Sequence, residues 1–149
     1  MIIQLQPEQI ASFWEGIKHG YFKANNILEK DQSIIGAKLL TNLFNGTHQA
    51  WLGFSIDDEG NKIVKYFGIT SIRENELDGR RTLRIDALYG FRTLDEEESI
   101  KDYESIKVFA RNSDCHSIQT VTSNPRIKEL MRLVGMQPAE ITYELSLEG

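Results

Sequence analysis

Cysteine is nearly absent from this chain. Cys115 stands alone among 149 residues, so no disulfide can form within one molecule. Disulfides belong to oxidising compartments, and a chain without them is typical of the cytoplasm. No apolar run is long enough to cross a bilayer, and residues 1–5 are too short for the core of a signal peptide. We therefore expect a cytoplasmic protein without a membrane partner.

An excess of positive charge is missing as well. The sequence has 17 Lys and Arg against 22 Asp and Glu, which gives a net charge of −5. Proteins that bind nucleic acids attract the phosphates with positive charge. Arg80, Arg81 and Arg84 form a small basic cluster, but no aromatic residues are interleaved with them to stack on bases. Binding of nucleic acids is therefore not expected.

Metal-ligand spacing is the third absence. His19, His48 and His116 lie far apart in the sequence, so we predict no metal site and expect these histidines at the surface. Cys115 and His116 are adjacent on a predicted strand and point to opposite faces, which argues against a Cys–His nucleophile pair.

Two amphipathic helices are predicted in the first third of the chain, after a short strand at residues 1–5. Pro7 suits the first turn of a helix. Apolar residues then recur at helical spacing in two stretches, which are Ile10, Phe13, Trp14, Ile17 and Tyr21, and Ile35, Leu39, Leu40, Leu43 and Phe44. Gly46 follows the second stretch as a helix C′ residue should.

The apolar period then changes to two, which predicts strands at 50–56, 62–72 and 82–89. Short polar links join them, so we expect an antiparallel meander. Leu83, Ile85 and Ala87 are expected to face one layer of the protein. Arg84 and Asp86 would then share the opposite face.

The last third alternates helices and strands. A helix is predicted at 93–112 with Thr93 and Glu96 as a capping box, followed by a strand at 116–123, a helix at 125–134 and a strand at 141–147. The acidic run 95–98 is expected to be a capped, solvated helix start. The whole order predicts one α+β domain over residues 1–149, with a mixed central sheet and helices on both faces.

This order resembles the GNAT acyltransferase fold. The segment NPRIKELMRLVGM, residues 124–136, resembles the family's segment at the end of the fifth strand and in the following helix, with matching Asn124, Ile127, Leu130 and Gly135. The YGF at 89–91 before the acidic helix start, together with NPRI, is similar to small GNAT-like proteins encoded by phages and prophages. The resemblance implies central strands that splay near 87–90 and 122–124, leaving a V-shaped cleft.

The same resemblance implies an N-acyltransferase with acetyl-CoA or another acyl-CoA as its cofactor. The implied cofactor-binding residues are Leu88, Tyr89, Gly90, Arg92 and Asn124. Backbone atoms of 88–90 would hold the pantetheine, and Asn124 would hydrogen-bond the ligand. The acceptor would be a small-molecule or protein amine, and a homodimer is compatible with the sequence.

Two residues are candidates for proton transfer in such an enzyme. Asp86 would act as a general base near the cleft, and Tyr143 would replace the family's tyrosine in the last helix, whose place is taken by Met131. A thioether cannot donate a proton. The structural alternatives are an Arg84–Asp86 contact for the acid and a packing role on the last strand for Tyr143.

A second function stays open because the diphosphate loop departs from the family's pattern. Its two glycine places hold Asp95 and Glu97. A carboxylate about 6 Å from a phosphate charge repels it by roughly 0.7 kcal/mol in water and by about 3 kcal/mol at an effective dielectric constant of 20. The alternative, with no cofactor, is a non-enzymatic binding or structural protein that keeps the fold.

Overall fold

One five-stranded sheet organises the computed structural model, which describes residues 1–90 and 95–148. The strands follow the order β1-β2-β3-β4-β5, with β1 (Ile2–Gln4), β2 (His48–Ile56), β3 (Lys62–Glu74), β4 (Arg81–Gly90) and β5 (Cys115–Thr120). Neighbours pair antiparallel except β4 and β5, which are parallel. The predicted mixed sheet and its antiparallel meander are therefore confirmed.

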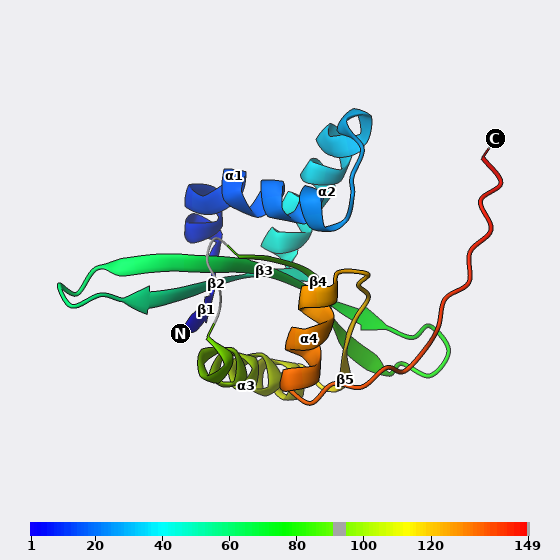
Figure 1. Ribbon diagram of the computed structural model, residues 1–149. Coiled ribbons are helices and arrows are strands. Elements are labelled where there is room, and N and C mark those ends of the chain that lie inside the picture. The colour runs from blue at the N-terminus through cyan, green and yellow to red at the C-terminus, as the bar shows by residue number, and fades with distance from the viewer. Residues whose placement is uncertain (91–94, 149) are drawn as a thin grey trace.

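Helices cover both faces of the sheet, as predicted. Figure 1 shows α1 (Pro7–Ala24) and α2 (Gln32–Asn45) on one face, and α3 (Glu96–Asn112) and α4 (Pro125–Leu133) on the other. A short 3-10 helix, η1 (Glu29–Asp31), lies between α1 and α2. Within the described residues, no helix is long and apolar enough to cross a membrane.

Each face of the sheet has its own apolar core. On the α1/α2 side, the helical stripes supply Ile10, Ile17, Leu39 and Leu43, which pack against sheet residues that include Leu52 and Phe67. On the α3 side, Trp51 and Leu83 pack with Ile106 and Ala110. Adjacent Trp51 and Leu52 thus serve opposite cores, as the two-residue period of a strand requires.

A β-bulge in β4 corrects the predicted strand faces. Ala87 pairs with Ile69 and Ile85 pairs with Thr70, so Asp86 is an extra residue in β4. Leu83 accordingly belongs to the α3-side core and Ala87 to the α1/α2-side core. The expectation that both face one layer was wrong because an inserted residue reverses the alternation beyond it.

The structure differs from the prediction at two further boundaries. Helix α3 begins at Glu96 with Asp95 as its N-cap, and the predicted cap Thr93 lies outside the described residues. The strand predicted at 141–147 is wrong, since residues 137–148 form no strand or helix and run outward from the sheet (Figure 1). An alternating segment forms a strand only where another strand edge supplies its hydrogen bonds, and here none does.

Candidate functional site

An open cleft lies where β4 and β5 separate. Their parallel pairing ends at Ile85 and Thr120, and the following residues of both strands line a cleft of about 1010 Å³. The end of α1 and the starts of α3 and α4 complete its walls. The cleft is therefore formed at the place where the sequence predicted the strands to splay.

The structure brings four of the five predicted cofactor-binding residues together on this cleft. Leu88, Tyr89 and Gly90 line it from β4, and Asn124 lines it from the start of α4. Arg92 lies outside the described residues. Their role in binding remains a prediction, but their common location is what an extended ligand between the two strands would require.

Asn124 also caps helix α4, which limits what it can offer a ligand. Its side-chain oxygen accepts a hydrogen bond from the backbone N–H of Arg126 at 2.9 Å. The cap stabilises the helix start. Because the oxygen is used in this way, the amide Nδ2 is the group that can donate to a ligand.

The start of α3 is filled by the chain's own carboxylates. The Asp95 side chain accepts from the backbone N–H of Glu97 at 3.1 Å, and Glu98 is paired with Lys65 at 2.5 Å. Glu96 lines the cleft. The expected capped helix start is thus confirmed. An anion at this helix start would meet the carboxylates of Asp95 and Glu96.

Asp86 lies at the centre of a charged cluster on the α1/α2 side of the bulge. Its side chain is only 5% exposed, and its Oδ1 lies 3.4 Å from Nε of Arg84 and 3.7 Å from Nη2 of Arg73. The Nε2 of His48 lies 3.6 Å from its Oδ2. The predicted Arg84–Asp86 contact is therefore present. Asp86 does not itself line the cleft.

The cluster nevertheless adjoins the cleft through α1. The Asn25 side chain donates to the main-chain oxygen of Asp86 at 3.1 Å, while Ala24 and Asn26, on either side of Asn25, line the cleft. The bulge thus holds the Asp86 cluster beside one wall of the site.

His48 was missed by sequence reasoning, which expected it at the surface. It is largely buried, and its Nδ1 has no hydrogen-bond partner among the described residues. Burial lowers the pKa of His48 below its ordinary value of 6.5, and the opposing effect of Asp86 is smaller. A neutral imidazole beside a carboxylate can accept a proton. The strand register brings His48 to Asp86 from a distant segment, so no local signal could have found it.

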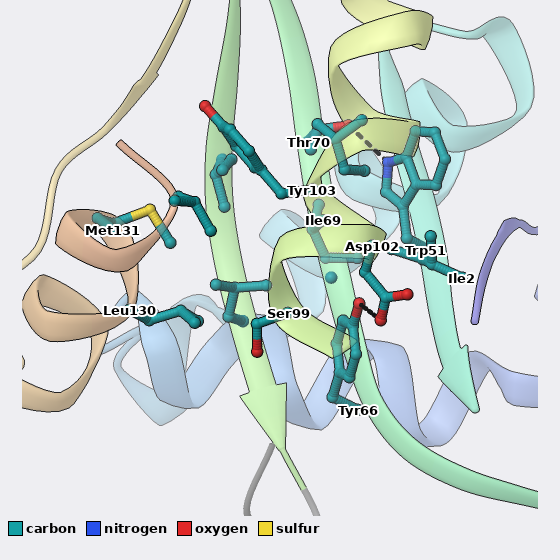
Figure 2. A pocket seen from close by; sticks show the side chains of 15 residues that line it. Ile2, Trp51, Tyr66, Ile69, Thr70, Ser99, Asp102, Tyr103, Leu130 and Met131 are labelled. Carbon is teal, nitrogen blue, oxygen red and sulfur yellow. Dashed lines mark hydrogen bonds between the residues drawn. The ribbon is translucent and has the colours of Figure 1, made fainter. Parts of the chain in front are cut away.

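Tyr66 is a second residue that the sequence did not single out. It lines the cleft, and its hydroxyl donates to the buried carboxylate of Asp102 at 2.8 Å (Figure 2). Burial and Asp102 raise the pKa of Tyr66, so it stays protonated. A Cβ at Gly53 would lie 1.9 Å from the Tyr66 ring, which explains the glycine.

Tyr143, the second candidate for proton transfer, lies away from the cleft. Met131 lines a small apolar cavity of about 60 Å³ beneath the cleft, together with Tyr66 and Tyr103 (Figure 2). Tyr143 is 89% exposed on the segment that leaves the sheet. The structure therefore does not bring Tyr143 to the cleft, because the strand that would have carried it there does not form.

Comparison with known proteins supports the fold. No protein-family model matches the chain, and a search of the curated proteins gave no match. Solved structures do match. A probable acetyltransferase is 14% identical, with a TM-score of 0.72 over 100% of this chain and 99% of that one. A predicted acetyltransferase from Clostridium acetobutylicum, solved with acetyl-CoA, is 12% identical, with a TM-score of 0.72 over 99% and 96%.

An enzyme of assigned activity is also similar. The aminoglycoside N-acetyltransferase AAC(6')-Iy, solved in complex with CoA, is 13% identical and has a TM-score of 0.61 over 100% of both chains. At such identities the likeness shows the fold alone. This chain has the α+β fold of the GNAT acetyltransferases, with a mixed five-stranded sheet.

Proposed function

We propose that this chain is an acyl-CoA-dependent N-acyltransferase that works in the cytoplasm. The observation that carries the proposal is the separation of β4 and β5 beyond Ile85 and Thr120, which opens the cleft. An extended pantetheine arm can lie between two such strands and take the backbone hydrogen bonds that they no longer give each other. The similar structures solved with acetyl-CoA and CoA support this choice of ligand.

Each wall of the cleft has a part in this proposal. The backbone of Leu88, Tyr89 and Gly90 would hold the pantetheine, and Nδ2 of Asn124 would donate to it. The bound acyl-CoA would supply the thioester carbonyl that an amine attacks. The acceptor is a small-molecule or protein amine, and the Asp86–His48 pair beside the α1 wall of the cleft is the candidate proton acceptor.

Calorimetric titration with acetyl-CoA at low salt tests the proposal. S-acetylpantetheine, which lacks the nucleotide diphosphate, is the informative comparison because the start of α3 is acidic. We expect both compounds to bind, with little gain in affinity from the nucleotide portion. If neither compound gives heat of binding at millimolar concentration, the proposed function is refuted.

A second candidate rests on the carboxylates at α3. The Asp95 cap and Glu96 favour a binding or structural protein, of phage or prophage origin as the resemblance implies, that keeps the fold without the coenzyme. The double variant Asp95→Ser, Glu96→Gln removes two charges and keeps a capping oxygen. If only this variant binds acetyl-CoA, the carboxylates are the obstacle and the second candidate is favoured. If the wild type and the variant bind acetyl-CoA with equal affinity, the second candidate function is excluded.

A further inference from the structure

The small cavity beneath the cleft adjoins the cleft directly. Four residues line both spaces, and they come from four different elements, namely Tyr66 on β3, Leu88 on β4, Ser99 on α3 and Leu130 on α4. From this border the cavity extends between the sheet and the helices α3 and α4 (Figure 2). A ligand in the cleft can therefore place one of its groups in the cavity.

The buried polar side chains around the cavity are hydrogen-bonded to the protein. The Tyr66 hydroxyl donates to Asp102 at 2.8 Å, and Nε1 of Trp51 donates to Oγ1 of Thr70 at 2.9 Å. The Ser99 hydroxyl donates to a main-chain oxygen at the start of α3 at 2.9 Å. The surface that stays open to the cavity is almost entirely apolar. Apolar cavities stay dry and bind apolar molecules, because they offer water no partners.

The volume of the cavity limits the length of the group that fits. An apolar cavity of about 150 Å³ binds benzene, which corresponds to about 25 Å³ for each carbon atom. On this scale, the cavity of about 60 Å³ accepts about two or three carbon atoms. A short alkyl chain therefore fits the cavity, and a long chain does not.

The cavity and the candidate proton acceptor lie on opposite sides of the sheet. The cavity is on the side of α3 and α4, whereas Asp86 and His48 are on the α1/α2 side of β4. A thioester carbonyl between the separated strands can extend its alkyl chain into the cavity while an amine approaches from the other side. The bound chain then leaves the path of the amine open.

We propose that the transferred acyl group is a short saturated chain of four or five carbons, and that the cavity binds its last two or three carbons. This inference rests on the proposed function and names the class of acyl-CoA for the same site. The amine nitrogen forms an amide bond with the acyl carbonyl carbon, and the carbon–sulfur bond breaks. The proton that the amine loses balances the departing thiolate, so that free CoA thiol is the second product.

Calorimetric titration with acetyl-, butyryl- and octanoyl-CoA tests the proposal. Burial of one methylene increases affinity about 4-fold, so butyryl-CoA should bind about 10-fold more tightly than acetyl-CoA. Octanoyl-CoA should bind no more tightly than acetyl-CoA, because its chain is longer than the cavity. The control 3-hydroxybutyryl-CoA has the carbon chain of butyryl-CoA with one hydroxyl. It should lose the gain in affinity, because the polar groups around the cavity are already paired.

Two results of this titration would overturn the inference alone. They are equal affinities for acetyl- and butyryl-CoA, and an affinity that continues to rise up to octanoyl-CoA. If none of these compounds binds, the proposed function itself is refuted, and the inference fails with it.

The variant Gly68→Ala tests whether the chain lies in this cavity, which Gly68 lines. A Cβ at this position would lie 3.4 Å from Cδ2 of Leu88 and 3.7 Å from Cβ of Trp51, which are ordinary contact distances. The variant should therefore fold, which thermal unfolding checks. Because the added methyl group fills part of the cavity, the preference for butyryl-CoA over acetyl-CoA should be lost. An unchanged preference would contradict the proposal.

The variant Ile106→Val tests the cavity in the opposite direction. Ile106 lines the cavity, so the loss of one carbon enlarges the space for the chain. The affinity for hexanoyl-CoA should rise relative to that for butyryl-CoA. Ile17→Val makes the same change in the α1/α2-side core and is the matched control, which should leave the preference for chain length unchanged. Equal preferences in these two variants would also contradict the proposal.

Discussion

The two halves of β4 have opposite surroundings. From Arg81 to Ile85 the strand is paired on both sides, with β3 and β5, and it contributes the fully buried Leu83 to the core. From Ala87 to Gly90 it pairs with β3 alone, and Leu88, Tyr89 and Gly90 line the cleft. The first half therefore belongs to the core of the sheet, and the second half forms one wall of the cleft.

The bulge at Asp86 marks the boundary between the halves. It reverses the side-chain alternation and places Asp86 in a cluster with Arg84 and His48. Bulges commonly redirect a side chain or end a strand pairing beside a functional site. The comparison teaches that one inserted residue separates a structural half of the strand from a half available for binding.

The largest expected effect is a difference in unfolding free energy between alanine variants in the two halves of β4. Leu83→Ala should cost about 2–5 kcal/mol of unfolding free energy, because the side chain is fully buried in the closed half. Leu88→Ala, a partly exposed position on the cleft, should cost about 1 kcal/mol. Urea denaturation measures both. An equal or larger loss for Leu88→Ala would mean that the open half is also part of the core.

The next effect concerns Tyr66, which lies opposite Gly90 in the open half. Tyr66→Phe removes the 2.8 Å hydrogen bond to Asp102 and leaves a buried carboxylate without that donor. We expect a loss of about 1–3 kcal/mol in the same denaturation experiment. Tyr103→Phe, at a half-buried tyrosine on the same cavity, is the control and should change stability little. Equal losses of unfolding free energy in the two variants would show that the Tyr66–Asp102 hydrogen bond adds no stability of its own.

A smaller effect is expected in ligand affinity at Asn124. Asn124→Ser keeps an oxygen that can cap α4 and removes the amide donor, so acetyl-CoA should bind about 2- to 10-fold more weakly at nearly unchanged stability. Asn124→Ala also removes the cap and should cost about 1 kcal/mol of stability. Calorimetry and thermal unfolding report the two quantities separately. Unchanged affinity in Asn124→Ser would remove this residue from the proposed site.

The smallest expected effect is the pH dependence contributed by His48. Its pKa is lowered in the folded state, so the unfolded chain binds a proton first as pH falls below about 6.5, and stability is lost toward acid. His48→Gln should reduce the slope of unfolding free energy against pH in that range. His116→Gln, at an exposed ring, controls for the change of imidazole to amide. An unchanged slope in His48→Gln would show that His48 is not held neutral.

Much of the fold was predictable from local patterns. The helices α1, α2 and α4 and the meander follow from apolar periodicity, Pro7 and Gly46. The position of the cleft was implied by the resemblance that the NPRI segment carries. The strand predicted at 141–147 failed because alternation describes the faces of a strand and not its partner. Residues 141–147 have the right pattern, but no strand edge among the described residues pairs with them.

The site was predictable only where its residues are adjacent in the sequence. Leu88–Gly90 at the end of β4 and Asn124 at the start of α4 line the cleft, and their role in cofactor binding stays a prediction. No glycine at Asp86 indicates a bulge in the sequence. The bulge is defined only by the register of β4 with β3. Tyr66 reaches the cleft and His48 reaches Asp86 through pairing of distant strands, which periodicity within one segment cannot reveal.

An amide NMR titration of the labelled protein with acetyl-CoA tests the central claim most directly. We predict saturable shifts at Leu88–Gly90 and at 121–124, with little change at Leu83 and Ile85 in the closed half of β4. Shifts confined to the closed half or to residues 137–148, or no shifts at millimolar ligand, would contradict the assignment of the open half as the acyl-CoA site.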